Sequence, residues 1–116
     1  MKLRSRTLAI AALNSYAAHY AEAFVTLYED SGLWNEELIL EGYRKSAKRI
    51  RDEILDSIQL HLSRKQIVGR KEIKHGWYEI SFHVDTRLII VHYSEDKQTN
   101  TRWVESISIG RKPIIF

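Results

Sequence analysis

Two stretches of the sequence, Trp77-Tyr-Glu-Ile-Ser-Phe-His-Val84 and Arg87-Leu-Ile-Ile-Val-His-Tyr93, decide the fold. In the first stretch apolar and polar residues alternate, which is typical of a strand with one face in the core. The second stretch is almost continuously apolar and β-branched, which predicts a central strand covered on both faces. Between them, Asp85-Thr86 predicts a tight turn. We therefore expect an antiparallel hairpin here.

The C-terminal segment extends this hairpin into a three-stranded antiparallel sheet. Glu95 to Asn100 is polar and predicts a hairpin loop, and Thr101 to Ile109 returns as the next strand, ending at Gly110. Pro113 has no backbone N–H, so Ile114 to Phe116 is expected at a sheet edge or in irregular packing.

Upstream of the sheet, apolar residues recur with the three-and-four spacing of amphipathic helices. One helix is expected over residues 11–31, with Gly32 as its stop. A second helix is expected from Asn35, whose side chain can cap free amides, to about Arg64. Residues Leu3 to Ile10 fit either an extension of the first helix or a short strand, and we favour the strand.

The economical architecture is one α+β domain over residues 1–116, with two N-terminal helices packed on a curved antiparallel sheet and a short N-terminal strand as an option. A chain of 116 residues with 44% hydrophobic residues can bury a core without disulfides or structural metals. Cysteine is absent, which excludes disulfides, thiolate metal sites and a cysteine nucleophile, and fits a reducing cytoplasm. The N-terminus lacks the plan of a signal peptide, and no segment reaches the ~20 apolar residues of a membrane span. We therefore expect a cytoplasmic protein without a membrane partner.

The chain is mildly basic, with a formal net charge of +3. This favours nucleic acid, an acidic protein partner or simply a soluble surface. One face of the second expected helix carries a run of cations with acidic residues interspersed: Arg44, Lys45, Lys48, Arg49 and Arg51. We interpret this run as a solvated helix face, and a face that binds RNA or a protein partner is the alternative.

Four basic side chains lie near strand ends. Arg87 opens the central strand, whereas Arg111 and Lys112 follow the last one, and antiparallel neighbours bring opposite strand ends together. A guanidinium can hold a phosphate with two hydrogen bonds and stabilise the extra charge of a pentacovalent transition state. His83, two residues before the turn, can transfer protons during cleavage by an RNA 2′-hydroxyl. This set therefore predicts phosphate chemistry.

Two other constellations have weaker support. His75, His83 and His92 do not have metal-ligand spacings even with the neighbouring Glu79 and Glu105, so no metal is expected. Several aromatic residues alternate with polar ones on the expected strands and can stack RNA bases if exposed: Trp77, Tyr78, Phe82, Tyr93 and Trp103. We expect core packing for most of these, and least for Trp77 and Trp103.

The stretches from Trp77 to Ser81 and from Arg87 to Tyr93, together with Ile107-Ser-Ile-Gly-Arg-Lys112 and Phe116, resemble the RelE/ParE superfamily of bacterial type II toxins. The likeness covers about the last forty-five residues of the chain, and the preceding helices agree in kind. It implies two helices against an antiparallel sheet whose first strand is N-terminal. RelE-like members cut messenger RNA in the ribosomal decoding site, whereas ParE-like members inhibit DNA gyrase and are not nucleases.

The resemblance also implies roles for individual residues. Arg87 matches a phosphate-binding arginine, and Lys112 resembles a charge stabiliser or acid donor. Phe116 fits a late aromatic residue that positions a base. His83 matches a histidine of the YafQ-like branch.

This chain departs from the ribonuclease branch at one pair of positions. That branch has two lysines where this chain has Glu79 and Ser81, which leaves His83 as the substitute general base.

The sequence and the resemblance together predict a metal-independent endoribonuclease without a cofactor. The expected catalytic residues are His83, Arg87 and Lys112, and the expected substrate-binding residues are Arg111 and Phe116. The expected partners are a cognate antitoxin, whose acidic or amphipathic segment lies over the basic sheet or helix groove, and the ribosome with its messenger RNA. The alternative is a ParE-like gyrase inhibitor or a diverged protein-binding module that acts through the exposed face of the second helix.

Overall fold

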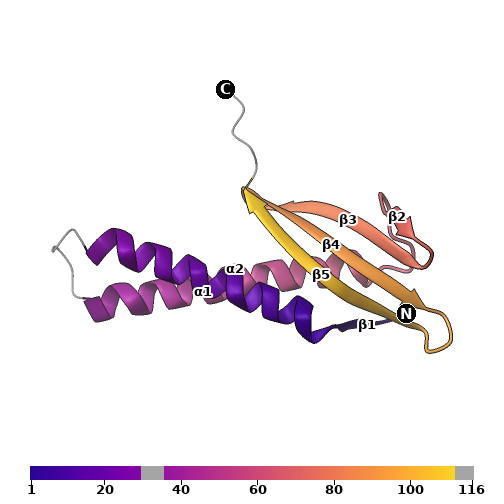
Figure 1. Cartoon of the computed structure of the whole chain (residues 1–116), viewed down its shortest axis with the longest axis horizontal. Helices are drawn as coiled ribbons and strands as arrows, with labels where there is room; N and C mark the ends of the chain where they lie inside the picture. Colours follow the sequence, from indigo (N-terminus) through magenta and orange to yellow (C-terminus); the bar gives the residue numbers. More distant parts are fainter. Residues whose placement is uncertain (30–35, 112–116) are drawn as a thin grey trace, which may run out of the picture.

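The computed structural model describes the backbone of residues 1–29 and 36–111, and their side chains except at 20–29, 36–40, 43 and 111. The elements are β1 (Lys2–Ser5), α1 (Thr7–Glu29), α2 (Glu36–Leu62), β2 (Lys71–Lys74), β3 (Trp77–Val84), β4 (Arg87–Asp96) and β5 (Thr101–Arg111). Figure 1 shows two long helices side by side and a curved sheet, so the expected α+β class is confirmed. The expected helix stop Gly32, the cap Asn35 and the segment around Pro113 lie outside the described residues.

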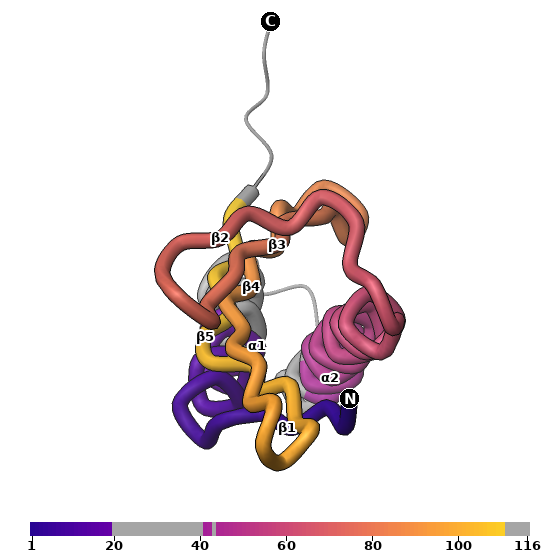
Figure 2. Tube along the Cα trace, turned by 90° about the vertical axis from the view of Figure 1, so that its right-hand side faces the viewer, coloured from indigo at the N-terminus to yellow at the C-terminus, as the bar shows by residue number. Residues whose placement is uncertain are grey.

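The sheet has five strands in the order β1-β5-β4-β3-β2. Strands β3, β4 and β5 pair antiparallel with one another, as expected, and β2 adds antiparallel to β3. Strand β1 runs parallel to β5, with Lys2 opposite Thr101 and Ser5 opposite Val104. The sheet is therefore mixed, which corrects the expectation of a wholly antiparallel one. Parallel neighbours need a long crossover connection, and the helices and strands between β1 and β5 supply it. Figure 2 shows the strands as one curved layer that does not close on itself.

The N-terminal prediction is partly correct. A strand forms, but it covers only Lys2–Ser5, and the expectation of a strand up to Ile10 is wrong because α1 begins at Thr7. The amide of Arg6 donates to the Val104 carbonyl at 2.9 Å, and the Arg6 carbonyl then accepts the first helical hydrogen bonds. From Ala9 onward the helical spacing buries one face, so burial favours a helix there.

Strand β2 was not expected from the sequence. Its four residues, Lys71–Lys74, are all exposed, so they carry no alternation of apolar and polar residues for a pattern to detect. The strand forms because it adds to the edge of β3, where Lys71 lies opposite Glu79. Two lysines in a four-residue edge strand are a common protection against edge-to-edge association.

Both helices pack against one side of the sheet, which we call the inner face. This face carries the buried side chains Ile80, Ile89, Val91, Tyr93, Val104 and Ile107. Helix α1 contributes Ala9 and Leu13, and helix α2 contributes Ile50, Ile54, Ile58 and Leu62. Since Ile54 is fully buried at 0% exposure, its truncation to alanine is expected to cost about 2–5 kcal/mol.

The opposite side of the sheet, the outer face, is not covered by α1 or α2. Strand β4 lies in the middle of the sheet, as expected, and its residues Ile89 and Val91 are fully buried on the inner face. Leu88 and Ile90 on the outer face are only half-buried. The expectation of a strand covered on both faces is therefore wrong: a continuous apolar run here marks a central strand, not a second layer of helices.

Helix α2 presents four of its five predicted cations to solvent, whereas Arg51 is half-buried and donates a hydrogen bond to Asn14 of α1. Lys45 pairs with Glu41 at 3.7 Å and Arg49 pairs with Glu53 at 3.8 Å, each one helical turn away. These intrahelical pairs favour the interpretation of a solvated face. In Figure 1 the paired helices extend beyond the sheet at one end. Over the described residues, neither helix is long and apolar enough to cross a membrane.

Candidate functional site

The hairpin between β3 and β4 places the predicted strand-end cluster. Val84 lies opposite Arg87, so the connecting turn is Asp85-Thr86, as the sequence predicts. Asp85 has a φ of 56°, in the left-handed region that Asp tolerates better than most residues. The turn fixes the register of the two strands and therefore the face on which each candidate side chain lies.

Arg87 and Arg111 occupy directly opposite positions in the antiparallel pair of β4 and β5. The predicted convergence of these two positions is therefore present in the backbone register. Lys112 and Phe116, the other two predicted residues of this end, lie outside the described residues.

The Arg87 side chain lies on the inner face. Its Nε donates a hydrogen bond to the hydroxyl of Tyr16 on α1, with 2.7 Å between the nitrogen and the oxygen. Both side chains are half-buried. Tyr16 lies on the first expected helix, over residues 11–31, and its ring packs against the core. Because the two residues are 71 positions apart, no local pattern could have joined them.

His83 lies on the outer face, where it is exposed and opposite Leu88. Side chains alternate along a strand, and its neighbour Val84 packs against the core with Arg87 opposite. The structure therefore does not bring His83 and Arg87 together, because the sheet itself lies between their side chains. The hairpin register, and not the distance along the chain, decides this separation.

His92 and Glu79 form a pair on the outer face. The Nε2 atom of His92 lies 2.9 Å from Glu79 Oε1, and both side chains are 36% exposed. His92 is therefore held by a cross-strand contact and does not fill a core position. Within the described part of the chain, no three histidine, cysteine or carboxylate side chains lie close enough together to hold a metal ion.

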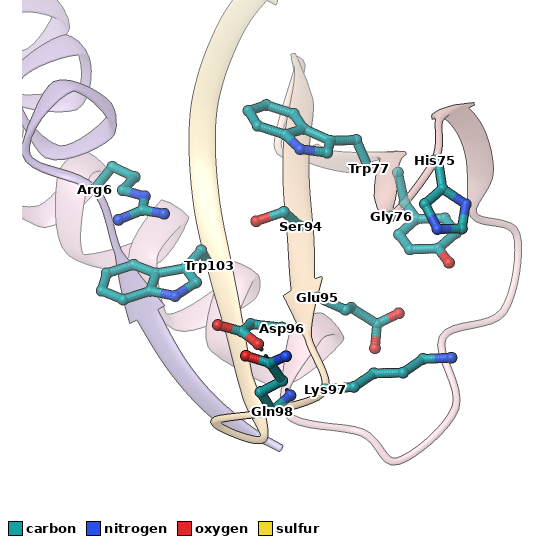
Figure 3. A pocket seen from close by; sticks show the side chains of 11 residues that line it. Arg6, His75, Gly76, Trp77, Ser94, Glu95, Asp96, Lys97, Gln98 and Trp103 are labelled. Atoms are coloured by element: carbon teal, nitrogen blue, oxygen red, sulfur yellow. Dashed lines mark hydrogen bonds between the residues drawn. The ribbon is translucent and has the colours of Figure 1, made fainter.

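A second cluster lies on the outer face at the other end of β4. Trp77 is opposite Ser94, Ser94 is opposite Trp103, and Trp103 is opposite Arg4, so these four residues form one row across four strands. A hollow of about 500 Å³ lies here, and its lining includes Trp77, Ser94 and Trp103. In Figure 3 the two tryptophans lie on either side of Ser94, and Arg6 lies next to Trp103. We call this feature the tryptophan hollow.

Charged groups hold the walls of the tryptophan hollow. The Arg6 guanidinium lies 3.9 Å from the ring centre of Trp103, and the Lys74 ammonium lies 4.1 Å from that of Trp77. Glu105 accepts hydrogen bonds from Arg6 Nε at 3.3 Å and from Ser94 Oγ at 2.8 Å. The expectation that these two tryptophans are the aromatic residues least committed to the core is met, whereas Tyr93 is fully buried.

A buried arginine anchors the sheet to α2 on the inner face. Arg102 is 2% exposed, and its guanidinium donates to the carbonyls of Leu62 at 2.6 Å and Arg64 at 2.9 Å. It also donates to Glu95 at 3.2 Å, and Glu95 pairs with Arg70 as well. The arginine thus caps the C-terminal end of α2, where backbone carbonyls lack helical partners.

The same region perturbs Tyr93, which packs beside Arg102 and Arg70. Burial raises the pKa of the Tyr93 hydroxyl above its usual value, and the Arg70 guanidinium offsets part of that rise. The pKa of Arg70 is also raised, with its contact to Tyr93 as the largest cause. At neutral pH Tyr93 and Arg70 therefore keep their ordinary charge states. This suits a structural anchor better than a catalytic site.

Comparison of this chain with protein-family models, curated proteins and solved structures found no match. Two places in the molecule carry candidate functional groups: the cationic strand end with Arg87 and the tryptophan hollow.

Proposed function

We propose that this chain is the toxin of a type II toxin–antitoxin pair of the RelE/ParE kind, and that it inhibits translation by cleaving messenger RNA on the ribosome. The observation that carries the proposal is the direct opposition of Arg87 and Arg111 at one end of β4 and β5. The resemblance matches Arg87 to a phosphate-binding arginine, the strand-end reasoning adds Arg111 to the same phosphate, and Lys112 follows in the chain. The order of a strand, two helices and then a sheet also agrees with what the resemblance implies.

The contact between Arg87 and Tyr16 supports a role for this end of the sheet. A hydrogen bond at 2.7 Å holds the guanidinium in one orientation before any substrate arrives. Such preorganised donors stabilise developing charge without reorganising during the reaction. The chemistry needs no cofactor, because the attacking group in this class of cleavage is the RNA 2′-hydroxyl and the protein supplies charge and proton transfer.

His83 is not the general base in this proposal. His83 is exposed on the outer face and cannot reach a phosphate held by Arg87 on the inner face. We assign proton transfer to the Tyr16 hydroxyl, which contacts Arg87, and to Lys112. Phe116 keeps its proposed role in positioning a base, and a cognate antitoxin with an acidic segment is the proposed inhibitor of the cationic strand end.

The separation of His83 from Arg87 favours a second candidate, a ParE-like gyrase inhibitor or a protein-binding module. In that case the sheet contributes scaffold, and the helix pair that extends beyond it binds the target (Figure 1). Lys48 and Arg49 are exposed on α2 and offer cations to an acidic partner. The charge reversals Lys48→Glu and Arg49→Glu would then abolish activity, whereas substitutions at the strand end would not.

Induced expression in a bacterial host tests both candidates, with growth followed alongside primer extension on an abundant transcript. The ribonuclease proposal expects growth arrest with discrete, translation-dependent cuts that disappear in Arg87→Ala and Arg111→Ala variants which remain folded by circular dichroism. Arrest without cuts supports the second candidate. A folded, well-expressed protein without effect on growth refutes the ribonuclease and the gyrase inhibitor, and favours the protein-binding module.

His83→Ala separates the structural assignment of the acid–base group from the one based on sequence. Because His83 is on the outer face, the variant is expected to keep cleaving, whereas Tyr16→Phe is expected to cleave more slowly. The opposite pattern, with His83 essential and Tyr16 dispensable, would return the general base to His83.

A further inference from the structure

We propose that the tryptophan hollow binds an unpaired base of single-stranded nucleic acid. The hollow lies on the outer face, seven positions along β4 from Arg87, or about 23 Å at the rise of a strand. It is therefore a second site, on the other side of the sheet from the proposed phosphate site. The inference goes beyond the proposed toxin function and does not depend on it.

The strand register sets the backbone positions from which the two indoles project. Trp77 on β3 and Trp103 on β5 lie opposite the same residue, Ser94 on β4. Their backbone positions are therefore two strand spacings apart, about 9.5 Å. In Figure 3 the Trp103 indole lies on the Arg6 side of β5, so the two indoles offer separate stacking surfaces along one row. A flat ring stacks on an indole with the ring centres about 4.5–7 Å apart. Ser94, between the two tryptophans in the row, is small and leaves space above the sheet.

Polar groups line the hollow where the edge of a base would lie. Ser94 carries a hydroxyl that donates to Glu105, and Gln98 contributes an amide at the rim. A base that stacks on an indole in the hollow still needs partners for its ring nitrogens and exocyclic groups, and side chains of this kind provide them. Stacking dominates such sites, since every base has an aromatic face and binding is tolerant of sequence.

The charges around the hollow favour a phosphodiester-linked ligand. The carboxylates already have partners within the protein: Glu105 with Arg6, Glu95 with Arg70 and Arg102, and Asp96 with the backbone amides of Gln98 and Thr99. The cations project from the rim and remain exposed: Arg4, Arg6, Lys74 and Lys97. The backbone of a nucleic acid whose base enters the hollow passes these cations. A neutral sugar would leave the cations without an ionic partner, and an acidic ligand without a ring would leave the indoles without a stacking partner.

Each wall of the hollow also has a cation on it. Arg6 lies over Trp103 and Lys74 lies over Trp77, at 3.9 Å and 4.1 Å from the ring centres. These contacts hold the indoles in place and keep a positive charge beside each stacking surface. Arg6 keeps 48% of its side chain exposed, so it can reach a phosphate while it contacts the ring.

Fluorescence anisotropy with a labelled single-stranded RNA of about ten nucleotides tests the proposal. Purified wild-type protein is expected to bind, with an affinity that falls steeply between about 50 and 200 mM salt. Trp77→Ala and Trp103→Ala are each expected to weaken binding by about tenfold or more, since each removes a stacking surface. Ser94→Phe fills the floor of the hollow and is expected to weaken binding to a similar degree while both tryptophans remain.

Leu60→Ala is the matched control, because Leu60 is 63% exposed on α2 and its truncation removes apolar surface far from the hollow. This variant is expected to bind like the wild type. A variant that loses its circular dichroism spectrum is replaced by the leucine substitution at the same tryptophan. Absence of binding at low salt, equal binding by wild type and all three hollow variants, or equal competition by a fully paired duplex or a neutral oligosaccharide would each overturn the proposal. Growth arrest is a separate readout, so failure here leaves the toxin proposal standing.

Discussion

Replacement of the buried Arg102 by methionine is the most demanding test of the packing described above. Methionine has a similar length and no charge, so it keeps much of the volume while removing all three hydrogen bonds. The carbonyls of Leu62 and Arg64 then lose their donor, and Glu95 keeps only Arg70. Removing one member of a buried ion pair costs about 3–5 kcal/mol, because the remaining charge is left in a dry environment.

We take about 4 kcal/mol as the expected loss in the free energy of unfolding, since the contact with Arg70 still compensates part of the charge of Glu95. A domain of this size has a total stability on the order of 10 kcal/mol. The melting temperature should therefore fall by about 15 °C, at roughly 4 °C per kcal/mol. Urea denaturation followed by circular dichroism measures the free energy, and a thermal scan measures the melting temperature.

Two further variants control this measurement. Arg44→Met removes an exposed arginine from α2, the helix that Arg102 caps, and is expected to change stability by no more than about 0.5 kcal/mol. The double variant Glu95→Gln with Arg102→Met removes both charges, so it should be less destabilised than the sum of its two single variants. A loss of less than about 1 kcal/mol in Arg102→Met would show that Arg102 does not anchor α2 to the sheet.

Three other outcomes follow from the same structure. Burial raises the pKa of Tyr93, so above pH about 10 the unfolded chain releases a proton that the folded chain keeps, and wild-type stability should fall as pH rises; Tyr93→Phe should show a smaller fall in its urea midpoint over that range. Gly76 has a φ of 76°, so Gly76→Ala should lose about 1 kcal/mol, whereas Asp85→Gly, at a φ of 56°, should lose nothing or gain up to about 1 kcal/mol in the same urea assay. Tyr16→Phe removes the hydrogen bond to Arg87 and should cost about 1 kcal/mol of stability; an unchanged urea midpoint would show that this contact contributes nothing to folding.

The sequence predicted those parts of the fold in which a local pattern dictates structure. The alternation in β3, the turn at Asp85 and the apolar run of β4 gave the hairpin, and helical spacing gave both helices. Strand β2 had no such pattern, since its four residues are exposed and pair only because β3 offers an edge. The parallel direction of β1 depends on how the chain crosses between layers, which no property of residues 2–5 reveals.

The candidate site was harder to predict because function depends on faces as well as strand ends. His83 and Arg87 were predicted to act together because they are close in the chain. The alternation of side chains along the strands puts them on opposite faces of the sheet. Tyr16 reached the site from a distant helix. The tryptophan hollow depends on three strands meeting in one register, so the sequence could identify Trp77 and Trp103 as the least core-like aromatics and could not place them around Ser94.

Because β1 pairs with β5, the N-terminal strand cannot complete its pairing until β5 has been synthesised. The ribosome synthesises Lys2–Ser5 before the other elements of this fold, yet the strand beside which these residues lie, Thr101–Arg111, is the last of these elements to be made. The two helices have local contacts and can pair early, but their apolar sides await the sheet. Nascent chains that stall before Thr101 therefore expose the surface around Ala9 and Leu13, where chaperones and proteases can reach it. The fold therefore closes only after β5 has emerged, although its partner β1 is made first.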